Sequence, residues 1–209
     1  MKIKTIFWIS LIVLGLWYWY DSQPITYGHG QIAPNTPVQK LGSKKPFKFK
    51  DDYEVLPLAT FDITGRILSR KRYWFDTESK LAPVDLAMGW GPMSDEKVLD
   101  ELKISQRNRW FYWKCENFPI PRKQIEYNAA NMHLIPANDG IESKIKDAKI
   151  GNLVHFKGFL VKITGKDGWW WQSSLSRTDT GDGACEVVFV KEFEIIEKEK
   201  VRLLLKNLN

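Results

Sequence analysis

The sequence predicts an α+β protein: an N-terminal transmembrane helix, followed by a small antiparallel β-barrel of OB-like type or a strongly curved sheet with a few short helices. Three observations favour this class. Residues 5–20 carry no charge. Segments in which apolar and polar side chains alternate, as in strands, recur along the rest of the chain. Helical patterns are short and isolated and do not alternate regularly with the strands.

The uncharged segment 5–20 (TIFWISLIVLGLWYWY) predicts a single-pass membrane anchor. Such a helix rises about 24 Å at about 1.5 Å per residue, which is short, but its last four aromatic rings favour the lipid–water interface. Two lysines precede it, which orients the N-terminus towards the cytoplasm. We expect an uncleaved signal anchor in the inner (cytoplasmic) membrane, with residues 21–209 extracytoplasmic. A cleaved secretory signal and a membrane-surface or buried helix remain open.

After the anchor, residues 1–20, the chain divides into an extended linker or strap, residues 21–52, and one β-rich domain, residues 53–209. The linker is rich in proline and glycine and has little apolar periodicity. Within it, residues 44–50 (KKPFKFK) interleave lysines with phenylalanines. This pattern indicates either contact with an anionic envelope surface or an edge strand with its lysines in water.

Long strands are predicted around two glycines. Segments 61–68 and 154–161 alternate up to Gly65 and Gly158 and then become more continuously apolar, as in strands that bend or bulge around a small barrel. Further strands are expected at residues 107–115, 169–175 and 184–196. The turn-forming sequence DTGDG at residues 179–183 predicts a hairpin between the last two.

Three helices are expected in the domain. Ser94 is a favourable N-cap for a short helix ending near Leu102. Asn138 or Asp139 could begin a second helix over residues 141–149. Leucines at helical spacing in residues 197–209 predict a final helix that either docks on the domain or binds a partner.

Composition disfavours several functional classes. A net charge of +6 on 209 residues is a mild excess, too weak to predict nucleic-acid binding. The three histidines and two cysteines are dispersed, so we predict no metal site. The sequence has no phosphate-binding glycine loop, no HExxH and no GxSxG, so we predict no cofactor.

Cys115 and Cys185 each fall in a predicted strand, with apolar neighbours on the same face. If the domain is exported to an oxidising space, they are candidates for a disulfide that closes about 70 residues. Two buried free thiols and a catalytic thiol are the alternatives.

The candidate binding residues centre on the segment 169–186 (WWWQSSLSRTDTGDGACE), which is dense in functional side-chain types. Indole rings fill cores and line binding surfaces alike, and hairpin tips need polar residues in any case, so a purely structural role is the alternative. Trp90 lies between two glycines and either faces a ligand or plugs the core. The candidates are Trp90, Trp169, Trp170, Trp171, Arg177 and Asp179.

His133 is the best single candidate for a general base, because it stands between amides in NMHLIPAN. Asp179, Arg177 or Cys185 would act with it. Asp179 also begins DTG, the short signature of aspartic proteases, but its charged and polar flanks depart from that pattern. A hydrogen-bonded structural histidine is the alternative.

The motifs LAPVDLAMGWGPMSD (residues 81–95), HLIPAN (133–138) and SSLSRTDTGDGACE (173–186) follow a short N-terminal anchor. In this combination the chain resembles a group of uncharacterised bacterial membrane-anchored proteins over most of its length after residue 50. The resemblance implies a bacterial envelope location and no particular activity.

Together these patterns predict a membrane-anchored envelope protein whose periplasmic domain is a non-catalytic binding or accessory module. Its partners would be the membrane, through residues 5–20, and a protein or an envelope polymer. An envelope hydrolase or transferase using His133 is the first alternative. The second is a single-stranded nucleic-acid binder with an OB-like face, which the expected compartment makes unlikely.

Overall fold

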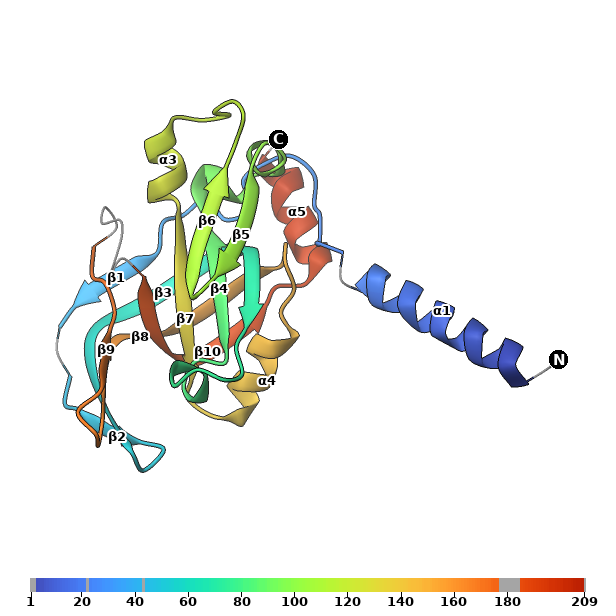
Figure 1. The fold of residues 1–209 in the computed structure, drawn as a ribbon. Helices are drawn as coiled ribbons and strands as arrows, with labels where there is room; N and C mark the ends of the chain where they lie inside the picture. Colours follow the sequence, from blue (N-terminus) through green and yellow to red (C-terminus); the bar gives the residue numbers. More distant parts are fainter. Residues whose placement is uncertain (1–2, 22, 43, 177–184, 209) are drawn as a thin grey trace.

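The structure is a computed structural model that describes residues 3–21, 23–42, 44–176 and 185–208 (Figure 1). Its helices are α1 (Ile3–Asp21), η1 (Glu78–Lys80), η2 (Gly91–Ser94), α2 (Glu96–Leu99), α3 (Arg122–Tyr127), α4 (Asp139–Asp147) and α5 (Lys198–Leu208). Its strands are β1 (Val38–Leu41), β2 (Phe47–Phe49), β3 (Tyr53–Arg72), β4 (Val84–Gly89), β5 (Lys103–Arg107), β6 (Trp110–Lys114), β7 (Ala129–Pro136), β8 (Leu153–Gly165), β9 (Trp170–Gln172) and β10 (Glu186–Ile195).

Five strands of the main sheet close into a ring. The sheet order is β1-β3-β4-β7-β10-β8-β9, and β3 also pairs with β8. The long strand β3 makes this closure, because its residues 53–66 pair with β8 and its residues 66–72 pair with β4. Strands β7 and β10 are parallel, whereas the other pairs of the ring are antiparallel. The sheet is therefore mixed, and the expectation of a purely antiparallel sheet was wrong.

Gly158 marks a point at which two backbones come unusually close. A Cβ atom at this position would lie 1.9 Å from the carbonyl oxygen of Phe189 on the paired strand β10. That separation is far below van der Waals contact, so the position requires glycine.

The main core fills the inside of the ring. Alternate side chains of the five strands point inward, and helices α4 and α5 contribute to the same cluster. Fully or almost fully buried members include Phe61, Ile63, Leu86, Met88, Trp90, Met132, Leu134, Phe156 and Val188. Burial of this apolar surface is the main favourable contribution to folding.

Two smaller clusters cover the outside of the ring. One packs Phe47 and Phe49 of β2, together with Trp169 and Trp171, over the outer face of β7, β8 and β10. The other packs hairpin β5–β6 against helices α2 and α3. The outer face of the ring is thus covered by segments from several parts of the chain, and the candidate site lies beneath them.

Helix α1 points away from the rest of the molecule (Figure 1), and the apolar side chains it carries are exposed, Trp17 to 63%. No helix among the described residues is long and apolar enough to cross a membrane. The expected transmembrane helix and signal anchor were therefore wrong, as was the placement as a single-pass inner-membrane protein with a periplasmic domain. One physical reason is that α1 ends in Trp and Tyr rings, whose N–H and O–H groups are polar.

The segment between α1 and β1 is hydrogen-bonded to the domain. The backbone N–H groups of Tyr27 and Gly28 donate to the carboxylate of Glu96, at 2.7 and 2.6 Å. Arg66 donates to the same carboxylate at 2.7 Å, and both side chains of this ion pair are largely buried. Glu96 therefore fastens the segment to strand β3 through buried, charge-assisted hydrogen bonds.

Candidate functional site

The candidate site is built around Arg109, at the tip of hairpin β5–β6. Asn108 and Arg109 have φ angles of 49° and 61°, the left-handed conformation found in two-residue hairpin turns. This conformation costs a residue other than glycine about 1–2 kcal/mol. The turn directs the Arg109 side chain onto the outer face of strand β4, where its interactions offset that cost.

The guanidinium group of Arg109 is fully hydrogen-bonded. Its Nε and Nη2 atoms donate to the two carboxylate oxygens of Asp76, at 2.9 and 2.8 Å. Its Nη1 atom donates to Asp85 at 2.9 Å, and both Nη atoms lie 3.3 Å from the carbonyl oxygen of Ala82. The ring centres of Tyr73 and Trp171 lie 4.2 and 5.6 Å from the guanidinium carbon. Bidentate ion pairing and ring stacking together hold the group in one position.

Asp85 connects Arg109 to His133. Its side chain is completely buried, and its Oδ2 atom lies 2.9 Å from Nδ1 of His133, an ion-pair distance in an orientation that does not form a hydrogen bond. The His133 ring packs against Trp171 with 4.7 Å between ring centres. A buried carboxylate requires a cationic partner, and Arg109 supplies one whether or not His133 is protonated.

Asn131 joins the hairpin tip to strand β7. Its Nδ2 atom donates to the carbonyl oxygen of Arg109 at 2.8 Å and lies 3.9 Å from the sulfur of Cys185. Its Oδ1 atom accepts from Gln106 at 2.6 Å. Cys115 packs with the hairpin cluster, and the sulfurs of Cys115 and Cys185 are not bonded to each other.

The pKa shifts favour the charged forms of Asp76 and Arg109 and the neutral form of Tyr73 at neutral pH. Hydrogen bonding from Arg109 lowers the pKa of Asp76 below its usual 3.8. Burial, together with the nearby charge of Asp85, raises the pKa of Tyr73, so its phenol stays neutral. Burial by itself lowers the pKa of Arg109, but hydrogen bonding to Asp76 and the charge of Asp85 outweigh burial and raise it.

Of the residues predicted from the sequence, the structure brings His133 and Trp171 together and places Cys185 beside Asn131. Trp169 packs against Tyr53 and Trp171. Trp170 is 61% exposed, and Lys162 lies over its ring.

The remaining predicted residues lie elsewhere. Trp90 is 1% exposed and belongs to the main core. Arg177 and Asp179 lie outside the described residues, so their predicted roles stay predictions. Within the described ranges, no group of three or more His, Cys, Asp or Glu side chains is arranged to hold a metal ion.

Four residues of this cluster were missed by sequence reasoning: Tyr73, Asp76, Asp85 and Arg109. One signal was available. Asp85 stands inside the apolar run LAPVDLAM, and a carboxylate in a buried strand needs a cation from elsewhere in the chain. The sequence does not show which of the 31 lysines and arginines provides that cation.

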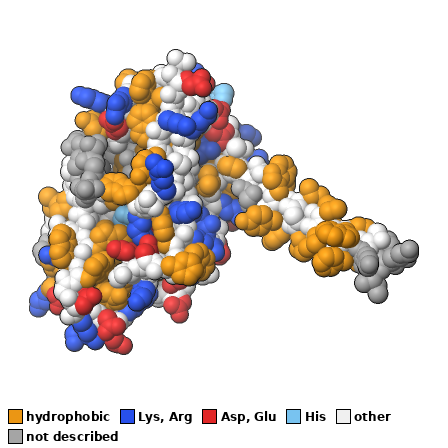
Figure 2. Space-filling view, viewed as in Figure 1, with side chains coloured by type: hydrophobic (Ala, Val, Ile, Leu, Met, Phe, Trp, Pro, Cys, Tyr) orange, Lys and Arg blue, Asp and Glu red, His pale blue; other side chains and the backbone are white. Residues whose placement is uncertain are grey.

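Two exposed aromatic side chains lie directly beside the cluster. Trp74 is 66% exposed and Phe75 is 100% exposed, and both lie between Tyr73 and Asp76 in the connection from β3 to η1. Figure 2 shows that apolar side chains cover α1 and also form patches among the charged groups on the body of the molecule. Trp74 and Phe75 differ from scattered surface residues because the residues on either side of them are fixed by Arg109.

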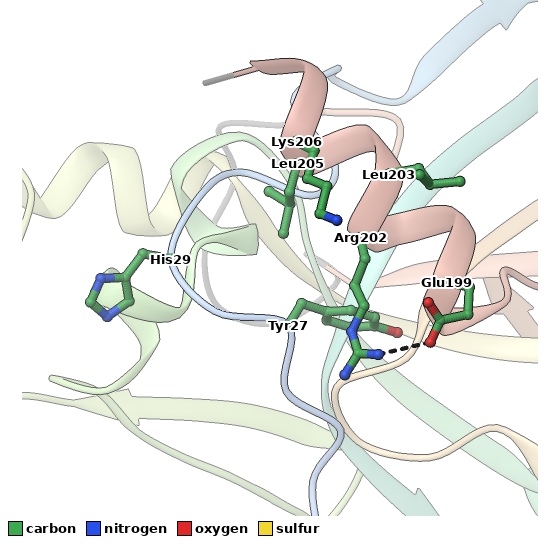
Figure 3. Close-up of a pocket in the computed structure, with 7 residues that line it drawn as sticks. All are labelled: Tyr27, His29, Glu199, Arg202, Leu203, Leu205 and Lys206. Atoms are coloured by element: carbon green, nitrogen blue, oxygen red, sulfur yellow. Dashed lines mark hydrogen bonds and ion pairs between the residues drawn. The ribbon is translucent and has the colours of Figure 1, made fainter.

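A separate hollow of about 390 Å³ lies between residues 27–29 and helix α5 (Figure 3). Arg202 and Glu199 lie together beside the Tyr27 ring, with 2.7 Å between their paired atoms, whereas His29 points away. Arg202 and Glu199 are exposed and form an ion pair with each other. Exposed pairs of this kind are common on protein surfaces and do not define a site.

No protein-family model matches the chain, and no curated protein or solved structure is significantly similar to it.

Proposed function

We propose that this protein is a non-catalytic binding module for a protein partner and that Trp74 and Phe75 form the centre of its contact surface. The observation that carries the proposal is the contrast between these two exposed aromatic side chains and the buried, fully hydrogen-bonded Arg109 beside them. A few residues provide most of the binding energy in protein interfaces, and tryptophan is one of the residue types enriched among them.

Residues 73–76 form a four-residue loop that is held by hydrogen bonds at both ends. At one end, the Tyr73 backbone N–H donates to Pro83 at 3.0 Å, and its hydroxyl accepts from the Arg109 backbone N–H at 2.9 Å. At the other end, Asp76 is held by the Arg109 side chain and also accepts from the Ser79 backbone N–H at 2.8 Å. A loop fixed at both ends loses less conformational entropy when a partner binds, which favours affinity.

The surroundings of the loop suggest the chemistry of the partner. Lys71 and Arg72 precede the aromatic pair, Lys80 follows it, and all three are exposed. Asp76 and Asp85 share the single guanidinium of Arg109, and Glu78 is partly exposed, so these acidic groups offset part of the positive charge and leave a small basic excess around the loop. The expected partner surface is an apolar pocket with acidic residues at its border.

The burial of His133 also supports binding over catalysis. The residue is 3% exposed, its ring is packed against Trp171, and its neighbour Asp85 forms an ion pair with Arg109. A general base must reach the proton it removes, and this imidazole has little access to solvent. We therefore assign the His133–Asp85 pair a structural role beneath the proposed contact surface.

Site-specific photocrosslinking tests the proposal. A photoreactive amino acid replaces Phe75 in the full chain, and in the control it replaces Leu41, which is 71% exposed on strand β1. After illumination of the protein's native cells, we expect one protein to be crosslinked at position 75 and not at position 41. The same set of products at both positions, or none at position 75, would refute the assignment of the surface.

A further inference from the structure

Strand β6 has an edge whose backbone groups have no partner among the described residues. It pairs only with β5, in a two-stranded sheet. The two-residue turn makes Arg107 and Trp110 a hydrogen-bonded pair, and such pairs alternate along an antiparallel ladder. Phe111 and Trp113 therefore direct their N–H and C=O groups away from β5, and no backbone hydrogen bond within the described part of the chain satisfies them.

A groove runs along this edge. A hollow of about 410 Å³ is lined on one side by residues 111–115 and on the other by Phe118, Arg122 and Glu126, the last two on helix α3. Successive side chains of a strand point to opposite faces. A hollow that touches four consecutive residues of β6, residues 111–114, therefore lies beside the strand and not over one of its faces.

Four of the eight residues that line the groove are aromatic, and three are charged. Phe118 is 57% exposed and Tyr112 is 40% exposed. The rings of Trp113 and Phe118 meet edge to face with 6.1 Å between their centres, and the Arg122 guanidinium lies 6.0 Å from the Trp113 ring. These walls suit an apolar side chain that lies between β6 and α3.

We propose that this groove binds an extended segment of a partner protein, which adds to β6 as a new strand. The backbone N–H and C=O groups at this edge can pair with the backbone of another chain. The aromatic side chains of the groove can pack against apolar side chains at alternate positions of that segment. Helix α3 borders the far side of the groove, so the space beside β6 suits a single chain better than the two-stranded hairpin of a second copy. This second surface goes beyond the proposed function and is independent of Trp74 and Phe75.

Peptide selection tests the proposal. A phage library of random nine-residue linear peptides is selected on the full-length protein, and an enriched peptide is labelled and titrated by fluorescence anisotropy. We expect Phe118→Ala to weaken binding at least tenfold. Leu41→Ala removes another exposed apolar side chain, which lies outside both proposed surfaces on strand β1, and should leave binding unchanged.

A second measurement uses the wild-type protein and does not depend on how a variant folds. Each backbone amide of the selected peptide is methylated in turn. Strand addition predicts that methyl groups at alternate positions weaken binding at least tenfold, whereas those between them have little effect. The proposal is overturned if no peptide is enriched, if Phe118→Ala leaves affinity unchanged, or if methylation is tolerated at every position.

Discussion

Replacing Arg109 with methionine tests the physical account of the candidate site. Methionine keeps much of the side-chain length but removes the cation that faces both Asp76 and Asp85. Asp85 is completely buried, so the variant leaves a buried carboxylate whose remaining ion-pair partner among the described residues is His133. Removing one partner of a buried ion pair typically destabilises a protein by about 3–5 kcal/mol. We expect Arg109→Met to lower the free energy of unfolding by about 3–5 kcal/mol.

Urea denaturation followed by tryptophan fluorescence measures this change, and the slope of the transition should stay constant if the folded and unfolded states are otherwise alike. Arg122→Met is the matched control, because the Arg122 side chain is 69% exposed and pairs with Glu126 on the same helix. Such surface pairs contribute about 0.5 kcal/mol or less. A loss below about 1 kcal/mol in Arg109→Met would refute the argument that this arginine stabilises a buried carboxylate.

Three further predictions concern stability. Hydrogen bonding from Arg109 lowers the pKa of Asp76 in the folded state, so Asp76 stabilises the fold above pH 3.8, and this stabilisation is lost as the pH falls towards the lowered pKa. Asp76→Asn should therefore reduce the fall in melting temperature between pH 6 and pH 2. Gly158→Ala should cost about 3 kcal/mol or more, measured by urea denaturation, because the new Cβ atom would lie 1.9 Å from a backbone oxygen; a loss under 1 kcal/mol would contradict this. Asn138→Ala should cost about 1 kcal/mol, because the Asn138 side chain accepts the Ile141 backbone N–H at the start of α4, and an unchanged melting temperature would count against it.

Much of the local structure could be predicted from the sequence because neighbouring residues determine it. The two glycine-centred segments lie in β3 and β8, and they pair with each other around Phe61 and Gly158. Helix α4 begins after Asn138, whose side chain caps it, as its position before an apolar stripe suggested. Alternation of side chains and capping are properties of a few consecutive residues, which one sequence is enough to show.

The hairpin β5–β6 was missed because its turn contains no glycine. Residues 107–115 were expected to form one strand, but Asn108 and Arg109 both take positive φ angles and reverse the chain. The contacts of Arg109 with Asp76 and Asp85 stabilise that conformation, and those residues lie more than twenty positions away in the sequence. Local propensity does not include stabilisation of this kind, which is why neither the turn nor the role of Arg109 in the site was predicted.

The local sequence also could not decide the position of Trp90. Glycines on both sides of a tryptophan left two readings open, an exposed contact residue or a core residue. In the structure Gly89 lies so close to the carbonyl oxygen of Met93 that a Cβ atom would be 2.4 Å away, and Trp90 is buried. The glycine allows the backbone to fold tightly and places the indole in the core.

The most direct test of the central claim is the dissociation constant of the partner crosslinked at position 75, measured for the wild-type protein and for the double variant Trp74→Ala/Phe75→Ala. Two exposed aromatic side chains at the centre of an interface contribute at least about 1.4 kcal/mol each, and each 1.4 kcal/mol is a tenfold change in affinity. We predict binding weakened by about 100-fold or more, with an unchanged free energy of unfolding. An unchanged dissociation constant in the folded double variant would contradict the account.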